Sequence, residues 1–278
     1  MSPHFFIHIP KTAGTSFRLA VESRFGSSAL VNDYGRESSS TSELVREHLY
    51  GDAPDPWRFY QACEQQGVTM LGGHVPARRF VPGVGAGKTV VFLRDPLARL
   101  LSDYRHFVRH YGYEGSFRSF FCKPAMINRQ MSFLAGVPLE ALGVVGLTER
   151  YPESLELVNA AYGWSLAERK DNRAPESASE LAISPDDREE LVKLNARDLA
   201  LYRAAEQAFR SRWDLFSRGE PFVHGHIQKA QGRVVAGWAW WGGASQAPVD
   251  VELLVNDRPT GLRQTPRPFP QSQTGALP

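Results

Sequence analysis

Three short apolar segments of this chain are each followed by a segment with helical spacing of apolar residues. The apolar segments are residues 5–9, 89–93 and 144–147, and the helical patterns that follow them lie at 16–24, 96–107 and 154–161. Apolar runs this short have the length of buried strands, whereas the longer periodic runs indicate amphipathic helices. Repeated strand-then-helix units build a parallel sheet covered by helices. We therefore predict an α/β fold.

Other segments complete this prediction. A second short strand is expected at 68–71, a polar surface loop at 32–41, and helices at 42–50 and 57–65. The apolar spacing from 184 to 213 predicts one long helix, with Ser184 or Asp186 as its N-cap.

The pattern changes after Pro221. Residues 227–241 and 249–255 alternate apolar and polar side chains and are separated by Gly and Pro, which indicates antiparallel strands. The residues from 263 on are rich in proline, which is typical of a disordered tail. We predict a main domain at 1–220, a small β-rich extension at 221–262 and a disordered tail at 263–278.

Composition narrows the classes of function. With 32 basic and 30 acidic residues among 278, the chain has no strong overall field, so we expect no nucleic-acid partner. The only cysteines, Cys63 and Cys122, have neither disulfide nor zinc-ligand spacing, and we expect no metal. The sequence shows neither a signal-peptide pattern nor an apolar run of about 20 residues, which predicts a soluble, cytoplasmic protein without a transmembrane segment.

The loop after the first predicted strand has the chemistry of an anion site. A glycine-containing loop that enters a helix directs backbone N–H groups at one point. Lys11 adds a positive charge there, and Gly14 lets the backbone approach closely; the hydroxyl donors of the loop are Thr12, Thr15 and Ser16. A solvated turn capped by these hydroxyls is the alternative interpretation.

A second glycine-rich segment, residues 83–89, ends in Gly-Lys-Thr and imitates a nucleotide-triphosphate loop. Position 82, where that loop needs its first glycine, is Pro82, and Thr89 is followed by an apolar strand pattern rather than a helix. We predict a turn before a strand, with Lys88 as an ordinary surface charge.

Arg94 lies at the carboxyl end of the predicted strand 89–93, at the edge where open parallel sheets bind ligands. Ser102 comes eight residues later, about two helical turns into the next helix. Together they form a candidate phosphate site. Alternatively, Arg94 forms a structural ion pair with Asp95 or Glu149.

Among eight histidines, His74 is the candidate general base, because it follows Gly72 and Gly73 at the end of a predicted strand and imidazole titrates near neutrality. A histidine hydrogen-bonded within a loop is the alternative. His8 falls inside the first predicted strand and has an expected structural role. His106 and His110, one helical turn apart, are more typical of a solvated face than of a metal pair.

Residues 8–16, of sequence HIPKTAGTS, resemble the 5′-phosphosulfate loop of carbohydrate sulfotransferases that use 3′-phosphoadenosine 5′-phosphosulfate (PAPS). Residues 92–96, FLRDP, together with Ser102, look like the 3′-phosphate motif of the same family, and residues 145–157 are similar to a stretch found in many bacterial members. The resemblance covers roughly residues 4–215 and points to the group related to heparan sulfate 2-O-sulfotransferase.

This resemblance implies a P-loop-like parallel sheet flanked by helices, PAPS as donor and a hydroxyl acceptor on a carbohydrate. It assigns the 5′-phosphosulfate to Lys11, Gly14, Thr15 and Ser16, and the 3′-phosphate to Arg94 and Ser102. His74 matches the Gly-His-Val segment with the family's catalytic histidine, and Lys11 is expected to stabilise the leaving oxygen. A later basic loop of the family has the possible counterparts Lys170, Asn172 and Arg173.

Two other functions remain open at this stage. A nucleotide-dependent kinase on a related fold is disfavoured because the Walker A spacing is absent. A catalytically silent glycan-binding protein is disfavoured because Lys11 and a base candidate are both present. Residues 232–241 resemble the start of a small β module attached to bacterial carbohydrate-active proteins, and the tryptophans Trp238, Trp240 and Trp241 either stack on sugar rings or pack in a core.

Overall fold

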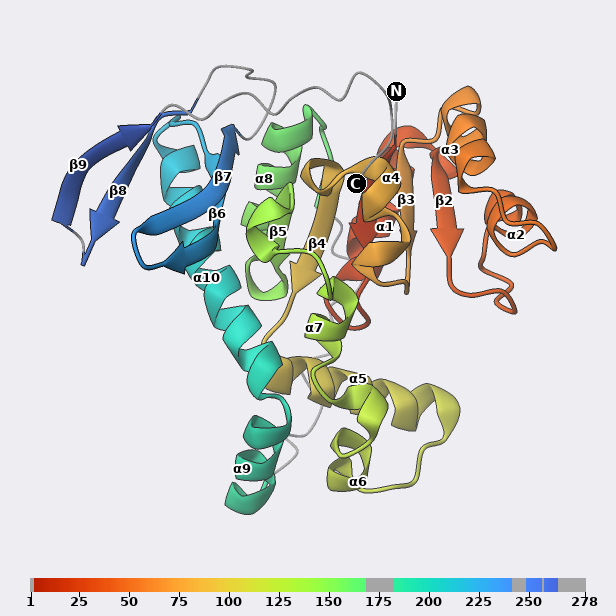
Figure 1. Ribbon diagram of the computed structural model, residues 1–278. Coiled ribbons are helices and arrows are strands. Elements are labelled where there is room, and N and C mark those ends of the chain that lie inside the picture. Colours follow the sequence, from red (N-terminus) through yellow and green to blue (C-terminus); the bar gives the residue numbers. More distant parts are fainter. Residues whose placement is uncertain (1–2, 169–182, 242–248, 257, 265–278) are drawn as a thin grey trace. The chain divides into compact units, whose positions relative to one another are not determined.

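The computed structural model describes residues 3–168, 183–241, 249–256 and 258–264 (Figure 1). It divides into two units, Met1–Asp214 and Leu215–Pro278, which we describe one at a time. The residues suggested for a later basic loop, Lys170, Asn172 and Arg173, lie outside the described residues.

The first unit is built on a parallel sheet of five strands in the order β2-β3-β1-β4-β5. This confirms the predicted α/β fold class. From β1 the chain adds strands on one side and then returns to add β4 and β5 on the other, so the strand order reverses beside β1. The strands are β1 (His4–Ile7), β2 (Leu30–Asp33), β3 (Met70–Gly73), β4 (Thr89–Leu93) and β5 (Val144–Leu147).

The strand β2 was not predicted, because only two apolar residues precede Asn32 and Asp33. It forms because its last residue, the fully buried Asp33, finds partners in the tertiary structure. Its carboxylate accepts hydrogen bonds from Tyr50 at 2.8 Å and from Arg79 at 2.9 Å. Asn32 and Asp33, which were predicted to lie in a loop, therefore belong to the edge strand β2.

Both faces of the sheet are covered, as its buried strands require. Successive side chains of β1 point to opposite faces. Phe6 contacts Phe17 of α1 (Gly14–Phe25), with ring centroids 4.7 Å apart, whereas Phe5 contacts Phe80 at 5.2 Å. Phe80 stacks in turn on Phe59 of α3 (Pro56–Gln65) at 5.7 Å. The alternating apolar pattern thus becomes two packed layers around the sheet.

The other helices are α2 (Glu43–Leu49), α4 (Val81–Val84), α5 (Pro96–Tyr111), α6 (Phe117–Phe121), α7 (Arg129–Leu134), α8 (Tyr151–Tyr162), α9 (Pro185–Leu194) and α10 (Ala196–Ser217). Helices α2, α3, α5 and α8 lie where the sequence predicts helices, whereas α4, α6 and α7 were not predicted; several helices start with a capping residue. Asp55 caps α3, and Asp95 caps α5, where its carboxylate accepts a hydrogen bond from the N–H of Ala98.

A second, smaller hydrophobic cluster joins α5, α6 and α9. Its buried members are Leu100, Phe117, Phe120, Phe121, Met126 and Leu191. In Figure 1, α5 and α6 lie beyond the arrowhead of β4, so this cluster supports the region past the carboxyl end of that strand. The helix α5 thereby extends away from the sheet edge as part of a rigid support.

The single long helix predicted from 184 to 213 is wrong, because the chain breaks at Asn195. Asn195 is fully buried and accepts a hydrogen bond from the N–H of Asn128 at 3.0 Å. The break lets Asp198 accept hydrogen bonds from the N–H groups of Gln130 and Met131, in the first turn of α7. The N-cap Ser184 was predicted correctly.

The second unit contains two antiparallel strand pairs. The first pair is β6 (Val223–Gln231) with β7 (Val234–Trp241), and the second is β8 (Val251–Val255) with β9 (Arg258–Gln264). The predicted strand at 227–241 is a hairpin, because Gly232 adopts a left-handed φ of 59° and turns the chain. The strand β9 extends to Gln264, two residues past the expected boundary at 262.

Candidate functional site

The loop between β1 and α1 has an unusual backbone. Lys11 and Ala13 both adopt left-handed conformations, with φ of 69° and 61°, although neither is glycine. A left-handed residue alternating with right-handed ones turns successive N–H groups toward one concave side, which binds anions. Such strain at non-glycine residues is held only where the surroundings enforce it, and it occurs often at functional sites.

The beginning of α1 is open to an anion. Ala13 occupies the N-cap position, so no side chain caps the helix, and the first turn contains no acidic residue. The free N–H groups and the positive end of the helix dipole therefore face outward. Lys11 and Ser16 are half-buried and Thr15 is exposed.

Thr12 has a different arrangement from the other hydroxyl residues of the loop. It is fully buried, and its hydroxyl donates a hydrogen bond to the carbonyl of Ile9 at 2.9 Å. The hydroxyl of Thr12 thus forms a hydrogen bond within the loop. This contact helps to hold the strained conformation.

Gly14 is required by close packing. A Cβ at this position would overlap the imidazole of His8 at Cδ2 and Nε2. The ring of His8 therefore lies directly beneath the loop.

Arg94 lies beside Lys11. Its Nη1 donates a hydrogen bond to the carbonyl of Lys11 at 3.2 Å, across 83 residues of sequence. Among the described residues, neither Asp95 nor Glu149 forms an ion pair with Arg94 within 4.0 Å, although both carboxylates raise its pKa. Its Nε is buried and has no hydrogen-bond partner among those residues.

The backbone of Arg94 is held from both sides by Gln130. The N–H of Arg94 donates to the Gln130 side-chain oxygen, and the Gln130 amide nitrogen donates to the Arg94 carbonyl, both at 2.9 Å. Glu149 accepts from the N–H of Asp95 at 3.0 Å and from the hydroxyl of Tyr202 at 2.9 Å. No local sequence signal marks Gln130, because it lies 36 residues from its partner.

Positive charge accumulates around this loop. Desolvation lowers the pKa of Lys11, the Asp103 charge opposes this shift, and Arg94 and Arg109 add to it. Desolvation also lowers the pKa of Arg94; the charges of Glu149 and Asp95 oppose this shift, and Arg105 adds to it. A bound anion would relieve this mutual repulsion.

The local acidic group, Asp103, is largely neutralised by other residues. It is buried and pairs with Arg99 at 3.2 Å, and Arg129 lies 3.9 Å from the same oxygen. Asp103 therefore offsets only part of the positive charge around Lys11.

Ser102 is half-buried on α5. No hydrogen bond connects it to Arg94 in the described part of the chain. Arg105, three residues later on the same helix, is close enough to Arg94 to lower its pKa. The role of Ser102 at a phosphate therefore stays a prediction.

His74 follows directly after β3 and meets two other rings. Its ring centroid lies 4.5 Å from that of His8 and 4.8 Å from that of Tyr34, both nearly edge-on. Desolvation, with a smaller contribution from Arg129, lowers its pKa to about 4, which leaves the imidazole neutral at neutral pH. The residue is also exposed to solvent, so one side of the ring is covered while another can meet a substrate.

Two residues near His74 were not recognised as site residues from sequence. His8 was expected inside the first strand, but β1 ends at Ile7 and His8 follows it. Tyr34 lies in a segment predicted only as a polar loop. A position just after a strand of a parallel sheet indicates a site residue. This signal was available for His8, which follows β1, but not for Tyr34, because β2 was not predicted.

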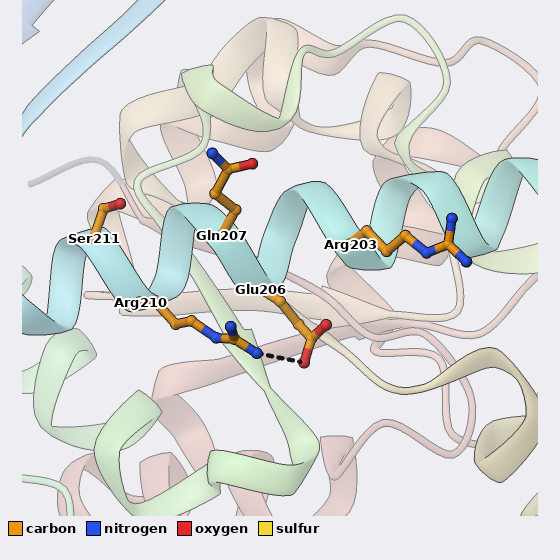
Figure 2. A pocket seen from close by; sticks show the side chains of 5 residues that line it. All are labelled: Arg203, Glu206, Gln207, Arg210 and Ser211. Atoms are coloured by element: carbon orange, nitrogen blue, oxygen red, sulfur yellow. Dashed lines mark ion pairs between the residues drawn. The ribbon is translucent and has the colours of Figure 1, made fainter.

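Two surface clefts of about 350 Å³ and 450 Å³ lie elsewhere. Figure 2 shows that the first follows one face of α10, from Arg203 to Ser211, with an ion pair between Glu206 and Arg210. The second is lined by residues between Arg36 and Gly51. Neither cleft collects groups from several elements, and we place the candidate site where the loop, Arg94 and His74 lie.

The described part of the chain contains neither a metal centre nor a membrane-spanning helix. Within the described ranges, no group of three His, Cys, Asp or Glu side chains is arranged to hold a metal ion. The rings of His106 and His110 lie 4.6 Å apart on α5. None of the described helices is both long and apolar enough to cross a bilayer.

Neither a protein-family model nor a curated protein matches this sequence. Among solved structures, the chain is similar to a sulfotransferase from Alicyclobacillus acidocaldarius, with 19% sequence identity and a TM-score of 0.41. The alignment covers 77% of this chain and 99% of that chain. Because a TM-score this low supports no functional conclusion, we base the proposal below on the residues of this chain.

Proposed function

We propose that this chain is a sulfotransferase that transfers the sulfuryl group of PAPS to a hydroxyl acceptor on a carbohydrate. The observation that carries the proposal is the contact between two anion-binding features. The strained loop of Lys11 meets the guanidinium of Arg94 at the sheet edge where the strand order reverses. Ligands of open α/β sheets bind at this point.

The residues present fit such a donor. The loop, the uncapped start of α1 and Lys11 offer N–H groups and a positive charge for the 5′-phosphosulfate. The guanidinium of Arg94, which lies beside the loop, is the proposed partner of a second phosphate, with Ser102 on the next helix as its proposed companion. PAPS carries both anionic groups, whereas ATP has no 3′-phosphate.

The transfer itself needs little covalent chemistry from the protein. The donor is already activated, so orientation and charge stabilisation supply most of the rate. Lys11 stabilises the charge that develops on the leaving phosphate oxygen. His74, neutral and partly open to solvent, accepts the proton of the acceptor hydroxyl.

A thermal-shift experiment tests the donor assignment. We expect 3′-phosphoadenosine 5′-phosphate to raise the unfolding temperature, because binding at one hundred times its Kd adds about 2.7 kcal/mol to the free energy of unfolding. ATP should raise the unfolding temperature much less. Equal shifts would favour a nucleotide-dependent kinase instead. Transfer of radiolabelled sulfate from PAPS to a panel of glycans then distinguishes an enzyme from a silent glycan-binding protein.

A further inference from the structure

Three rings from three strand ends meet beside the donor loop. A hydrogen bond joins Nδ1 of His8 to the hydroxyl oxygen of Tyr34 at 3.2 Å. The rings of His8 and Tyr34 each stand edge-on to His74, at 70° and 83°. Each ring thus contacts at least one of the others through its edge, in the arrangement that aromatic rings favour.

The backbone holds these rings firmly. The N–H of His8 donates to the carbonyl of Gly73 at 3.2 Å, and Gly14 closes the other side of the His8 ring. The N–H of Tyr34 donates to the hydroxyl of Thr41 at 3.0 Å, and this hydroxyl donates to the carbonyl of Gly35 at 2.7 Å. Because β1, β3 and β2 are adjacent in the sheet, the strand order itself brings the three residues together.

We propose, building on the proposed sulfotransferase function, that His8 and Tyr34 are positioning residues for the base His74. Their ring edges fix the orientation of its imidazole and cover one side of it, which leaves the other side for the acceptor. In the transfer step, a bond forms between the acceptor oxygen and sulfur while the bond from sulfur to the phosphate oxygen breaks. The electron pair stays on that phosphate, and the acceptor proton passes to His74.

Charged groups from each surrounding element act on this cluster. Arg129 of α7 lowers the pKa of His74, and Asp103 of α5 raises it. Burial lowers the pKa of His8, with smaller contributions from His74 and from Arg18 of α1. Burial raises the pKa of Tyr34, and Arg18 opposes that rise.

The largest contribution to the shift at both histidines is desolvation, which brings the pKa of His74 to about 4 and that of His8 to about 3. Both rings are therefore neutral when the acceptor binds near neutral pH. A cluster of this kind resists protonation of the base until the pH is low.

The test compares Tyr34→Leu, which removes the ring, with Tyr34→Phe, which removes only the bond to His8. Tyr60→Phe is a matched control, because its hydroxyl donates to the carbonyl of Phe80 outside the site. Two properties are measured for each protein: the pKa of His74 by NMR titration, and the acid limb of the pH profile of kcat/KM. Calorimetry with 3′-phosphoadenosine 5′-phosphate reports donor binding separately.

We expect Tyr34→Leu to raise both the NMR pKa and the acid limb by about one unit or more toward the ordinary value, because water reaches the ring. Tyr34→Phe should shift them less, and Tyr60→Phe not at all. Donor affinity should be unchanged in every variant. If Tyr34→Leu fails to fold, Tyr34→Gln gives the same comparison with a polar side chain.

An unchanged His74 pKa in Tyr34→Leu would overturn the positioning role, even if the enzyme transfers sulfate normally. An equal shift in Tyr34→Phe would contradict the assignment to the ring edge. If the wild-type chain transfers no sulfate, the proposed function fails, while the NMR titration still decides whether Tyr34 controls His74.

Discussion

At the residue scale, Lys11 combines a strained backbone with a partly desolvated charge. Its φ of 69° is uncommon for a lysine, and desolvation, with smaller contributions from nearby arginines, lowers its pKa. Both features are costly to the free protein and are relieved when an anion binds. The residue is therefore expected to contribute to donor binding and to the rate of transfer together.

We predict that Lys11→Ala weakens the binding of 3′-phosphoadenosine 5′-phosphate and lowers kcat by about 10²–10³, the usual loss when one preorganised electrostatic group is removed. Calorimetry and a transfer assay measure the two effects. Lys88→Ala serves as the control, because Lys88 belongs to the turn before β4. Unchanged affinity in Lys11→Ala would remove Lys11 from the donor site.

For His74→Ala we predict a loss of about 10²–10⁴ in kcat, the range of general base catalysis, with donor affinity unchanged. The base acts on the acceptor, so its removal should leave the affinity for the donor unchanged. A matched substitution at His48, on α2, should leave both values at the wild-type level. Wild-type turnover in purified His74→Ala would show that another group accepts the proton.

At the scale of the elements, a strand, a loop and a helix depend on one another through Gly14. The loop can lie over His8 only because position 14 has no side chain. The buried hydroxyl of Thr12 then closes the loop on Ile9. The packing of Gly14 on His8 therefore contributes both to the fold and to the candidate site.

The substitution Gly14→Ala should displace either the loop or the His8 ring. We expect a loss of about 1–3 kcal/mol in the free energy of unfolding, as for other overpacked sites, together with weaker donor binding. Gly225→Ala is the control, since a Cβ there would lie an ordinary 3.5 Å from the nearest atom. Denaturant unfolding and calorimetry measure the two quantities, and a fully stable Gly14→Ala with normal affinity would contradict the packing described.

At the scale of the whole molecule, stability should depend on the protonation of half-buried and buried histidines. Desolvation lowers the pKa of His4 to about 4, with a smaller contribution from Lys88. The unfolded chain titrates near 6.5, so between pH 6.5 and 4 the unfolded state binds more protons than the folded state. The contribution of His4 is complete above pH 6.5 and is lost as the pH falls through this range.

We therefore expect the urea concentration at the unfolding midpoint to decrease as the pH is lowered from 7 to 4.5. The decrease should be smaller in His4→Phe. Phenylalanine keeps an aromatic ring beside Tyr162 and Trp164, which lie 4.4 Å and 4.7 Å from the His4 ring, but it does not titrate. Urea unfolding at a series of pH values gives the comparison. Parallel pH dependence in the two proteins would show that His4 is not linked to folding.

The local pattern of the chain determined the type and order of most elements and the sulfotransferase hypothesis. The strands at 89–93 and 144–147 were predicted to the residue, and the loop of Lys11 was predicted to be an anion site. These features depend on neighbours within a few positions, because side-chain periodicity, helix caps and turns are local.

The tertiary structure alone decided what converges on the loop. Gln130 holds Arg94 across 36 residues, and Tyr34 reaches His8 across 26. The strand β2 and the break at Asn195 likewise form because distant partners satisfy buried polar groups. Such contacts depend on strand order and on the packing of remote segments. No short stretch of sequence contains both residues of such a contact.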